Sequence, residues 1–240
     1  MPRWAHDEVA RVFLRHGGQL WFLRTNMVGG HDPLVEPVPP TTLLGGIPFL
    51  GRGVQRLTDA LTTRIVWGEV LLTLLALALY AALAIPFGLQ NRFLVRQNAI
   101  GNPVRFGFHG VRLFFVPALL EEIFFRVMLL PHPTEGIPGG RWLLWAIASL
   151  ILFILYHRML GKTFYKAAND TLSDRRFLIL MGWLGLFLTG LYWITGSLWL
   201  CAFLHWAVVL GWIYALGGKA RLPHTRRRQR PSLPKTAIEP

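Results

Sequence analysis

Two adjacent glutamates, Glu121 and Glu122, lie inside the apolar run 113–130, and Arg126 follows Glu122 by four residues. A carboxylate near the middle of a bilayer costs about 3 kcal/mol even on the insertion scale that gives the lowest values. Ionisable groups retained there mark functional sites by default. A glutamate can also act as a general base that takes a proton from water. The run therefore indicates a polar reaction centre inside a helix bundle.

The two glutamates are expected to have different roles. On a helix, Glu122 and Arg126 share a face, whereas Glu121 points about 100° away. A guanidinium can hold a carboxylate through two parallel hydrogen bonds, which makes both charges tolerable in lipid. We therefore interpret Glu122 as a partner that locks helices together through Arg126. Glu121 remains available for chemistry.

Two histidines in other apolar stretches are candidate partners for Glu121. His205 lies inside the run 198–216 with apolar or small residues on both sides, and a histidine in the middle of a span is a functional candidate. His157 follows Phe153 by four residues and lies near the end of its own apolar stretch. Taken alone, His157 is more typical of an interfacial residue than of a catalyst.

Two histidines and a carboxylate could also hold Zn²⁺ or another divalent ion with one open coordination position. The chain has no HExxH motif, and spacing cannot test ligands that come from three helices. We expect no metal and no other cofactor, with a divalent metal held by Glu121, His157 and His205 as the alternative. Cys201, the single cysteine, precedes His205 by four residues, but a buried apolar cysteine is the commoner case.

The composition places this chemistry in a membrane. Of 240 residues, 53% are hydrophobic and 15% are charged, and the mean hydropathy is +0.41. Soluble domains carry about a quarter charged residues, so the chain is predicted to be an integral membrane protein. The net charge of +13 is explained by basic residues that flank spans and contact anionic lipid. Nucleic acid is not an expected partner.

The predicted fold is an all-α membrane protein, a helical bundle of about five transmembrane spans with amphipathic N-terminal segments. Residues 1–65 form an interfacial or cytosolic region, in which Gly17-Gly18 divides 9–27 into two short pieces on the membrane surface. The bundle takes 66–216, with its core at about 106–216. Residues 217–240 form a basic, disordered tail. The spans are expected at 66–89, 106–130, 142–160, 177–195 and 198–216.

Basic residues predict the orientation. The tail, the 158–176 loop and the 90–105 loop are rich in arginine and lysine, whereas the connections 131–141 and 195–197 hold one basic residue between them. The positive-inside rule then places the tail in the cytoplasm. The first span breaks the pattern, because Arg52, Arg56 and Arg64 precede it on the outer side. Either that segment is re-entrant, or the N-terminal region lies outside despite its charge.

Three motifs occur in order, each in its own expected span: EExxxR, FxxxH and a final histidine (Glu121, Glu122, Arg126, Phe153, His157 and His205). Together they resemble the CPBP superfamily, which contains the type II CAAX prenyl endopeptidases and prokaryotic membrane proteins linked to bacteriocin self-immunity. The resemblance covers about residues 113–212.

The resemblance implies an intramembrane endopeptidase of a prokaryotic inner membrane. On that pattern Glu121 and His157 polarise a water that attacks the scissile carbonyl, and His205 binds the developing oxyanion. Glu122, Arg126 and Phe153 support them. The implied substrate is a peptide, with a lipid-modified end as one form, which reaches the site from the surrounding membrane lipids.

One position departs from the family pattern. Four residues after the last histidine the family keeps asparagine or a similar polar residue, and this chain has Val209. Losing one oxyanion donor can cost about 10²–10³ in rate. A backbone N–H or the Trp206 indole substitutes, or the protein is a slow or inactive scaffold of the immunity type. A small transporter that uses the acidic pair as a proton relay is a third alternative.

The depths of Glu121, His157 and His205 in the membrane, estimated from their positions along the spans, do not agree for regular helices. At 1.5 Å per residue, Glu121 lies ~22 Å and His205 ~17 Å from the cytoplasmic ends of their spans, but His157 lies only ~5 Å deep. His157 can join the other two if its helix continues past Arg158 toward Lys166. The alternative is a break near Pro117 in the preceding span. We predict one of these two.

Overall fold

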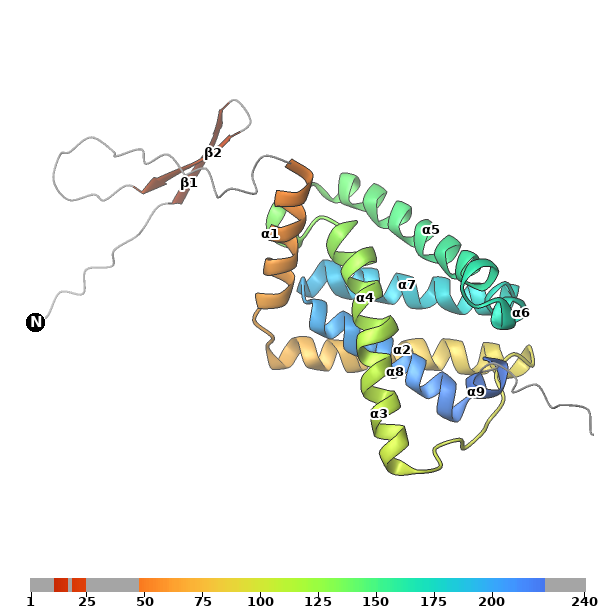
Figure 1. Cartoon of the computed structure of the whole chain (residues 1–240). Coiled ribbons are helices and arrows are strands. Elements are labelled where there is room, and N and C mark those ends of the chain that lie inside the picture. The colour runs from red at the N-terminus through yellow and green to blue at the C-terminus, as the bar shows by residue number, and fades with distance from the viewer. Residues whose placement is uncertain (1–10, 17–18, 25–47, 223–240) are drawn as a thin grey trace, which may run out of the picture. The chain divides into compact units, whose positions relative to one another are not determined.

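Four long apolar helices form the framework: α2 (Trp67–Gln90), α5 (Gly139–Thr163), α7 (Arg175–Thr195) and α8 (Leu198–Ala215) (Figure 1). Each is long and apolar enough to cross a bilayer. They correspond to four of the five expected spans. Large apolar side chains such as Leu71, Leu144 and Ile194 point outward and are more than half exposed, as lipid-facing residues are. The membrane-bundle prediction is confirmed.

The computed structural model describes residues 11–16, 19–24 and 48–222, in two units, Met1–Pro48 and Phe49–Pro240. In the first unit, β1 (Arg11–His16) and β2 (Gln19–Arg24) pair as antiparallel strands. The expected break at Gly17-Gly18 is therefore present, but the two pieces are strands. Aromatic and β-branched residues in both pieces favour this conformation. Residues 25–47 and the tail beyond 222 lie outside the described residues.

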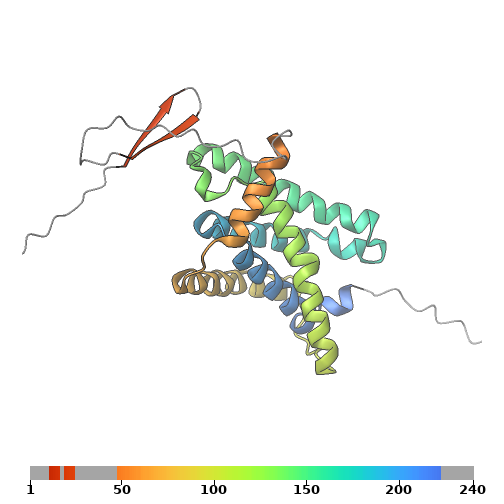
Figure 2. The ribbon, with the colours of Figure 1, turned by 60° about the vertical axis from the view of Figure 1, so that its left-hand side comes forward.

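The expected span 106–130 is not a single α-helix. It consists of α3 (Pro103–Leu113), the π-helix η1 (Phe114–Leu119), α4 (Leu120–Glu122) and the π-helix η2 (Ile123–Met128). The backbone leaves helical geometry at Val116 (φ −135°, ψ 108°), immediately before Pro117. Proline removes an N–H donor and disfavours helical geometry at the preceding residue. Figures 1 and 2 show that the 103–128 segment crosses the long helices instead of running beside them.

Both structural alternatives predicted for His157 are present. The backbone breaks at Val116 next to Pro117, and α5 continues past Arg158 to Thr163. The second feature places His157 inside the helix, six residues before its last residue. His157 is therefore deeper in the bundle than its sequence position indicated.

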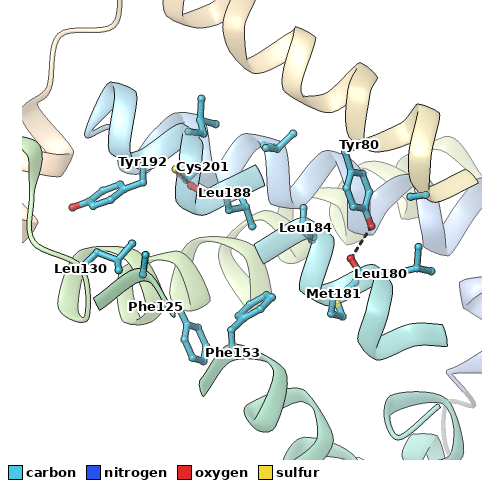
Figure 3. Packing of buried hydrophobic residues seen from close by; sticks show 14 of the residues in the cluster. Tyr80, Phe125, Leu130, Phe153, Leu180, Met181, Leu184, Leu188, Tyr192 and Cys201 are labelled. Carbon is cyan, nitrogen blue, oxygen red and sulfur yellow. Dashed lines mark hydrogen bonds between the residues drawn. The ribbon is translucent and has the colours of Figure 1, made fainter. Parts of the chain in front are cut away.

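The core lies where α7 is enclosed by its neighbours. Helix α2 packs against α7 and α8, and α5 packs against α7 on another face. Figure 3 shows Leu180, Leu184 and Leu188 of α7 among side chains of the surrounding helices. The Tyr80 hydroxyl donates to the Leu180 carbonyl at 3.3 Å, so even this polar atom is paired within the apolar core.

Helix α1 (Pro48–Thr62) attaches to one end of the bundle. Arg56 donates two hydrogen bonds to Glu135, from Nε at 2.6 Å and from Nη2 at 2.9 Å. Glu135 ends the 3₁₀ turn η3 (Pro133–Glu135) before α5. The Trp199 indole N–H donates to the Leu61 carbonyl at 3.0 Å. Helix α1 therefore lies at the end that holds the α7–α8 turn and the connection before α5.

The opposite end carries most of the basic residues. There the extended segment 95–99 donates backbone hydrogen bonds to the last residues of α8. Short turns complete this end: η4 (Lys166–Ala168), α6 (Asn169–Leu172) and α9 (Gly218–Arg221). Arg176 and Arg221 donate to the Asn91 and Arg92 carbonyls. By the positive-inside rule we expect this end to face the cytoplasm.

The basic residues before α2 still oppose that orientation. Arg56 is paired with Glu135 at the α1 end, but acidic partners change the topological bias of arginine little. Arg52 and Arg64 also precede α2. Because α2 runs without interruption from one end to the other, we expect α1 to lie on the outer side despite these charges.

Cysteine labelling tests this orientation. Cys201 is fully buried, so an added surface cysteine can be labelled selectively. We expect a membrane-impermeant maleimide to label Gln55→Cys on α1 in intact cells and to label Lys162→Cys only after permeabilisation. Equal access to both positions in intact cells, or access in the reverse order, would contradict the orientation.

The Arg56–Glu135 contact predicts a pH dependence. Partial burial raises the pKa of the Glu135 carboxyl, but hydrogen bonds from Arg56 and the His132 backbone N–H, with the Arg56 charge, outweigh it and hold the pKa below its ordinary 4.5. Because the folded pKa is lowered, the stabilisation is present above 4.5 and is lost as pH falls through the folded value. The Tm difference between wild type and Glu135→Gln should therefore shrink toward zero on acidification. A difference that is constant from pH 7 to pH 3 would refute this.

Candidate active site

Glu121 and Glu122 are held on α4 between two π-helical turns. The wider backbone of a π-turn shifts the direction of the side chains that follow it, and such turns are frequent at functional sites. Both glutamates are buried, with Glu122 fully enclosed and Glu121 8% exposed. The segment therefore presents two neighbouring carboxylates to the inside of the bundle.

Glu122 lies between a guanidinium and an imidazole. Arg126 Nε is 3.1 Å from Glu122 Oε2, and Arg126 Nη1 donates to Oε1 at 3.4 Å. His205 Nδ1 is 2.7 Å from the same Oε1. The Arg126 Nε contact is ionic and is not aligned as a hydrogen bond, since neither atom has a hydrogen-bond partner. The expected Glu122–Arg126 pair is present, and His205 joins it.

Arg126 also contacts two groups of the facing helices. Its Nη2 donates to the Gly185 carbonyl on α7 at 3.3 Å, and its guanidinium carbon lies 4.7 Å from the centre of the Phe153 ring on α5. A cation over an aromatic face is attracted by the ring quadrupole. A Cβ at Gly185 would lie 2.6 Å from Leu150, so glycine permits this close approach of α5 and α7. The sequence offered no signal that singled out Gly185.

The 123–128 π-turn is supported from α5. The Ser149 hydroxyl donates to the Phe125 carbonyl at 2.6 Å. Backbone groups left without a helical partner in lipid cost several kcal/mol each. Ser149 therefore stabilises the irregular backbone next to Arg126, and sequence reasoning did not identify it.

The ring orientation of each histidine follows from its Nδ1 partner. His157 Nδ1 is 2.9 Å from the Phe153 carbonyl, which can only accept, so Nδ1 carries the proton. His205 Nδ1 donates to the Glu122 carboxylate by the same reasoning. In both rings Nε2 is then the atom available for chemistry.

Both Nε2 atoms face one oxygen of Glu121. Glu121 Oε2 is 3.7 Å from His157 Nε2 and 3.8 Å from His205 Nε2. This oxygen is buried and has no hydrogen-bond partner among the described residues. The structure thus brings Glu121, His157 and His205 together from three separate segments, with Phe153 against both imidazole rings. The arrangement can hold a small polar group between a base and two imidazoles.

The buried groups Glu121, Glu122, Arg126, His157 and His205 carry a net negative formal charge when both histidines are neutral. Two carboxylates and one guanidinium leave one negative charge, and buried charge without compensation is costly. One additional proton on Glu121, His157 or His205 makes the cluster neutral. The site is therefore suited to accept and release a single proton.

Metal ligation was the alternative for these residues. No group of three or more His, Cys, Asp or Glu side chains in the part of the chain that the structure describes has the geometry of a metal site. The two Nδ1 atoms already have protein partners, so only Glu121 and two Nε2 atoms could serve as ligands.

Neither Val209 nor the Trp206 indole supplies a free oxyanion donor. Val209 packs in an apolar cluster with Leu113 and Ile213. The Trp206 indole N–H donates to the Gly110 carbonyl at 2.8 Å, so this donor is already engaged. Cys201 is buried with its sulfur directed to the Leu188 carbonyl, in agreement with a packing role.

Part of the chain that contains this site matches a known protein family. Residues 103–216 match the family model of Rce1-like type II CAAX prenyl endopeptidases. The match starts at α3, ends just after α8 and covers somewhat less than half of the chain. The resemblance to the CPBP superfamily is confirmed for this part of the chain. No curated protein and no solved structure was found to match.

Breaking the buried Glu122–Arg126 pair should be strongly destabilising. Glu122→Gln leaves Arg126 without its neighbouring countercharge, which typically costs about 3–5 kcal/mol. We expect a large fall in Tm and a much smaller fall for the double variant Glu122→Leu/Arg126→Met, which removes both charges. Glu69→Gln, at the start of α2, is the matched control. A Glu122→Gln variant as stable as this control would show that the pair does not hold the helices.

Proposed function

From the match of residues 103–216 to Rce1-like endopeptidases, we propose that this chain is a membrane-embedded endopeptidase that hydrolyses a peptide bond with a glutamate-activated water. The observation that carries the proposal is the buried Glu121 Oε2 with two imidazole Nε2 atoms facing it. A carboxylate with no competing hydrogen bond is free to accept the proton of a water.

The first step requires a base and an orienting group. Glu121 takes one proton from the water as its oxygen attacks the carbonyl carbon of the scissile bond. His157 Nε2 accepts a hydrogen bond from the same water and orients it, because its Nδ1 proton is held by the Phe153 carbonyl. General base catalysis of this kind contributes about 10²–10⁴ in rate.

The second step requires stabilisation of the oxyanion and a proton for the leaving amine. His205 carries the additional proton that makes the cluster neutral, and its Nε2–H donates to the oxyanion while Glu122 stabilises the imidazolium through Nδ1. Glu121 then gives the proton from the water to the amine nitrogen as the C–N bond breaks. The products are a carboxylic acid and an amine, and Glu121 is ready for another cycle.

Glu122, Arg126 and Phe153 act as positioning residues. They hold the two imidazoles and the α4 turn through the contacts already described, and none of them needs to touch the substrate. Preorganised groups in a water-poor site contribute more than the same groups in water.

The substrate is a peptide that reaches the buried site from the membrane. A peptide with a lipid-modified end fits this location, since its anchor would keep it in the bilayer beside the bundle. The protein would reside in a prokaryotic inner membrane with the tail in the cytoplasm, and the mechanism uses neither a metal nor another cofactor.

A second candidate function is a membrane scaffold of the immunity type with little or no turnover. The packing of Val209 against an apolar cluster and the engagement of the Trp206 N–H favour it, because the oxyanion would then have His205 as its main donor.

Substitution of Glu121 separates the two functions. With a quenched fluorescent peptide that carries a farnesylated cysteine near its C-terminus, we expect Glu121→Gln to lower cleavage by at least about 10²-fold with Tm unchanged or raised. The unmodified peptide tests the role of the lipid anchor. Glu69→Gln is the matched control and should retain full activity.

Retained cleavage in Glu121→Gln would refute the mechanism. If the wild-type protein cleaves neither peptide, and partner binding or biological effect survives Glu121→Gln in full, the scaffold function replaces the enzymatic one.

A further inference from the structure

An apolar cavity lies outside the glutamate site, between α2, α7 and α8. Its volume is about 130 Å³, and its wall is almost entirely apolar, with Ala84, Phe93, Leu94, Met181, Gly211 and Trp212 among the lining residues. Pockets that enclose a whole small molecule measure about 300–1,000 Å³. This cavity therefore has room for part of one hydrocarbon chain.

Two features of the cavity wall suit an occupant. A Cβ built on Gly211 would meet no atom within 4 Å, so this position of α8 is open. The Trp212 indole N–H is buried and has no hydrogen-bond partner among the described residues. A buried unsatisfied donor is costly, and a small turn of the ring toward the cavity would let an acceptor on the occupant remove this cost.

A cluster of arginines adjoins the cavity at the cytoplasmic end. The guanidinium carbons of Arg221 and Arg176 lie 4.6 and 5.7 Å from the centre of the Phe93 ring, and Phe93 also lines the cavity. Arg92 precedes Phe93 and is exposed. Asp174 is paired with Arg176. The Arg176 hydrogen bond, with the charges of Arg176 and Arg221, holds the Asp174 pKa below its ordinary value. The two guanidiniums of Arg176 and Arg221 and the one carboxylate of Asp174 thus leave an excess of one positive charge.

We propose that this cavity and the arginines beside Phe93 form a binding site for one anionic phospholipid of the cytoplasmic leaflet. One acyl chain enters the cavity, the phosphate contacts Arg176 and Arg221, and an ester carbonyl accepts the Trp212 indole hydrogen bond. The lipid is a bound structural ligand that is separate from the peptide substrate.

The order of chemical groups favours a phospholipid over other apolar occupants. A phospholipid presents a negative headgroup, then an ester acceptor, then a hydrocarbon chain. The site presents arginines, one unpaired N–H donor and an apolar cavity. Basic pockets between helices at the cytoplasmic side characteristically bind anionic headgroups. A simple hydrocarbon or isoprenoid chain would leave the Trp212 donor unpaired.

Native mass spectrometry and thermal unfolding of the full chain in detergent test this site. Added phosphatidylglycerol should be retained and raise Tm more than phosphatidylcholine with the same chains. Gly211→Leu places a side chain in the open space and should abolish the difference between the two lipids. Gly190→Leu on α7 is the matched control, because a Cβ there also meets nothing but does not line the cavity.

Separate variants test the headgroup and the ester. Arg221→Gln should weaken phosphatidylglycerol binding about fivefold, as expected for loss of one arginine near an anionic lipid surface, and Lys162→Gln should leave it unchanged. Trp212→Phe keeps the ring and removes the donor, so it should bind ester-linked and ether-linked phosphatidylglycerol equally, whereas the wild type should prefer the ester.

Three outcomes would overturn the proposal. Equal retention of phosphatidylglycerol and phosphatidylcholine would refute the headgroup site. Unchanged lipid binding in Gly211→Leu would refute the cavity as the place of the chain. A Tm increase of the same size with inorganic phosphate alone would show that the arginines bind an anion without a chain.

Discussion

The buried Glu122 carboxylate is the contact on which the rest of the bundle depends. It contacts Arg126 on its own segment and His205 on α8. Arg126 in turn donates to the Gly185 carbonyl on α7 and lies over the Phe153 ring on α5. Four segments thus meet around one ion pair. Because apolar side chains gain little from association in lipid, polar contacts of this kind help to specify which helices pack together. Replacing either charge would change both the packing and the position of His205.

The irregular backbone of the 103–128 segment helps to position the buried carboxylates. A regular α-helix would present Glu122 and Arg126 on one face and turn Glu121 away from it. The break at Val116 and the π-turns on both sides of α4 allow both carboxylates to be buried in the same interior. Such a backbone needs external hydrogen bonds in a membrane, and Ser149 supplies one to the Phe125 carbonyl. The polar centre and the distorted helix therefore require each other.

Sequence reasoning identified the residues of the centre better than their arrangement. Apolar runs predicted α2, α5, α7 and α8 closely, since run length alone decides whether a helix can span a bilayer. Charged or imidazole side chains in such runs are conspicuous, so Glu121, His157 and His205 could be named. Gly185 and Ser149 could not be identified, because a carbonyl acceptor and a hydroxyl inside an apolar helix carry no local signal. The attachment of α1 to the bundle could not be predicted either, because Arg56 and Glu135 are far apart in sequence and pair only in the folded chain.

The glutamate centre and the apolar cavity share a wall of aromatic rings. Phe177 lines the cavity, and its ring centre lies 5.9 Å from that of His157 and 5.6 Å from that of Trp212. His157 is held at its Nδ1 by one backbone carbonyl, so the packing of Phe177 also limits its tilt. A chain that fills the cavity would restrict Phe177 and thereby favour one orientation of the imidazole. By thermodynamic linkage, a peptide that favours this orientation would bind the occupied form more tightly and strengthen lipid binding by the same factor. Phe177 is thus the contact through which an occupant of the cavity could influence the imidazole, since no polar contact joins the two places among the described residues.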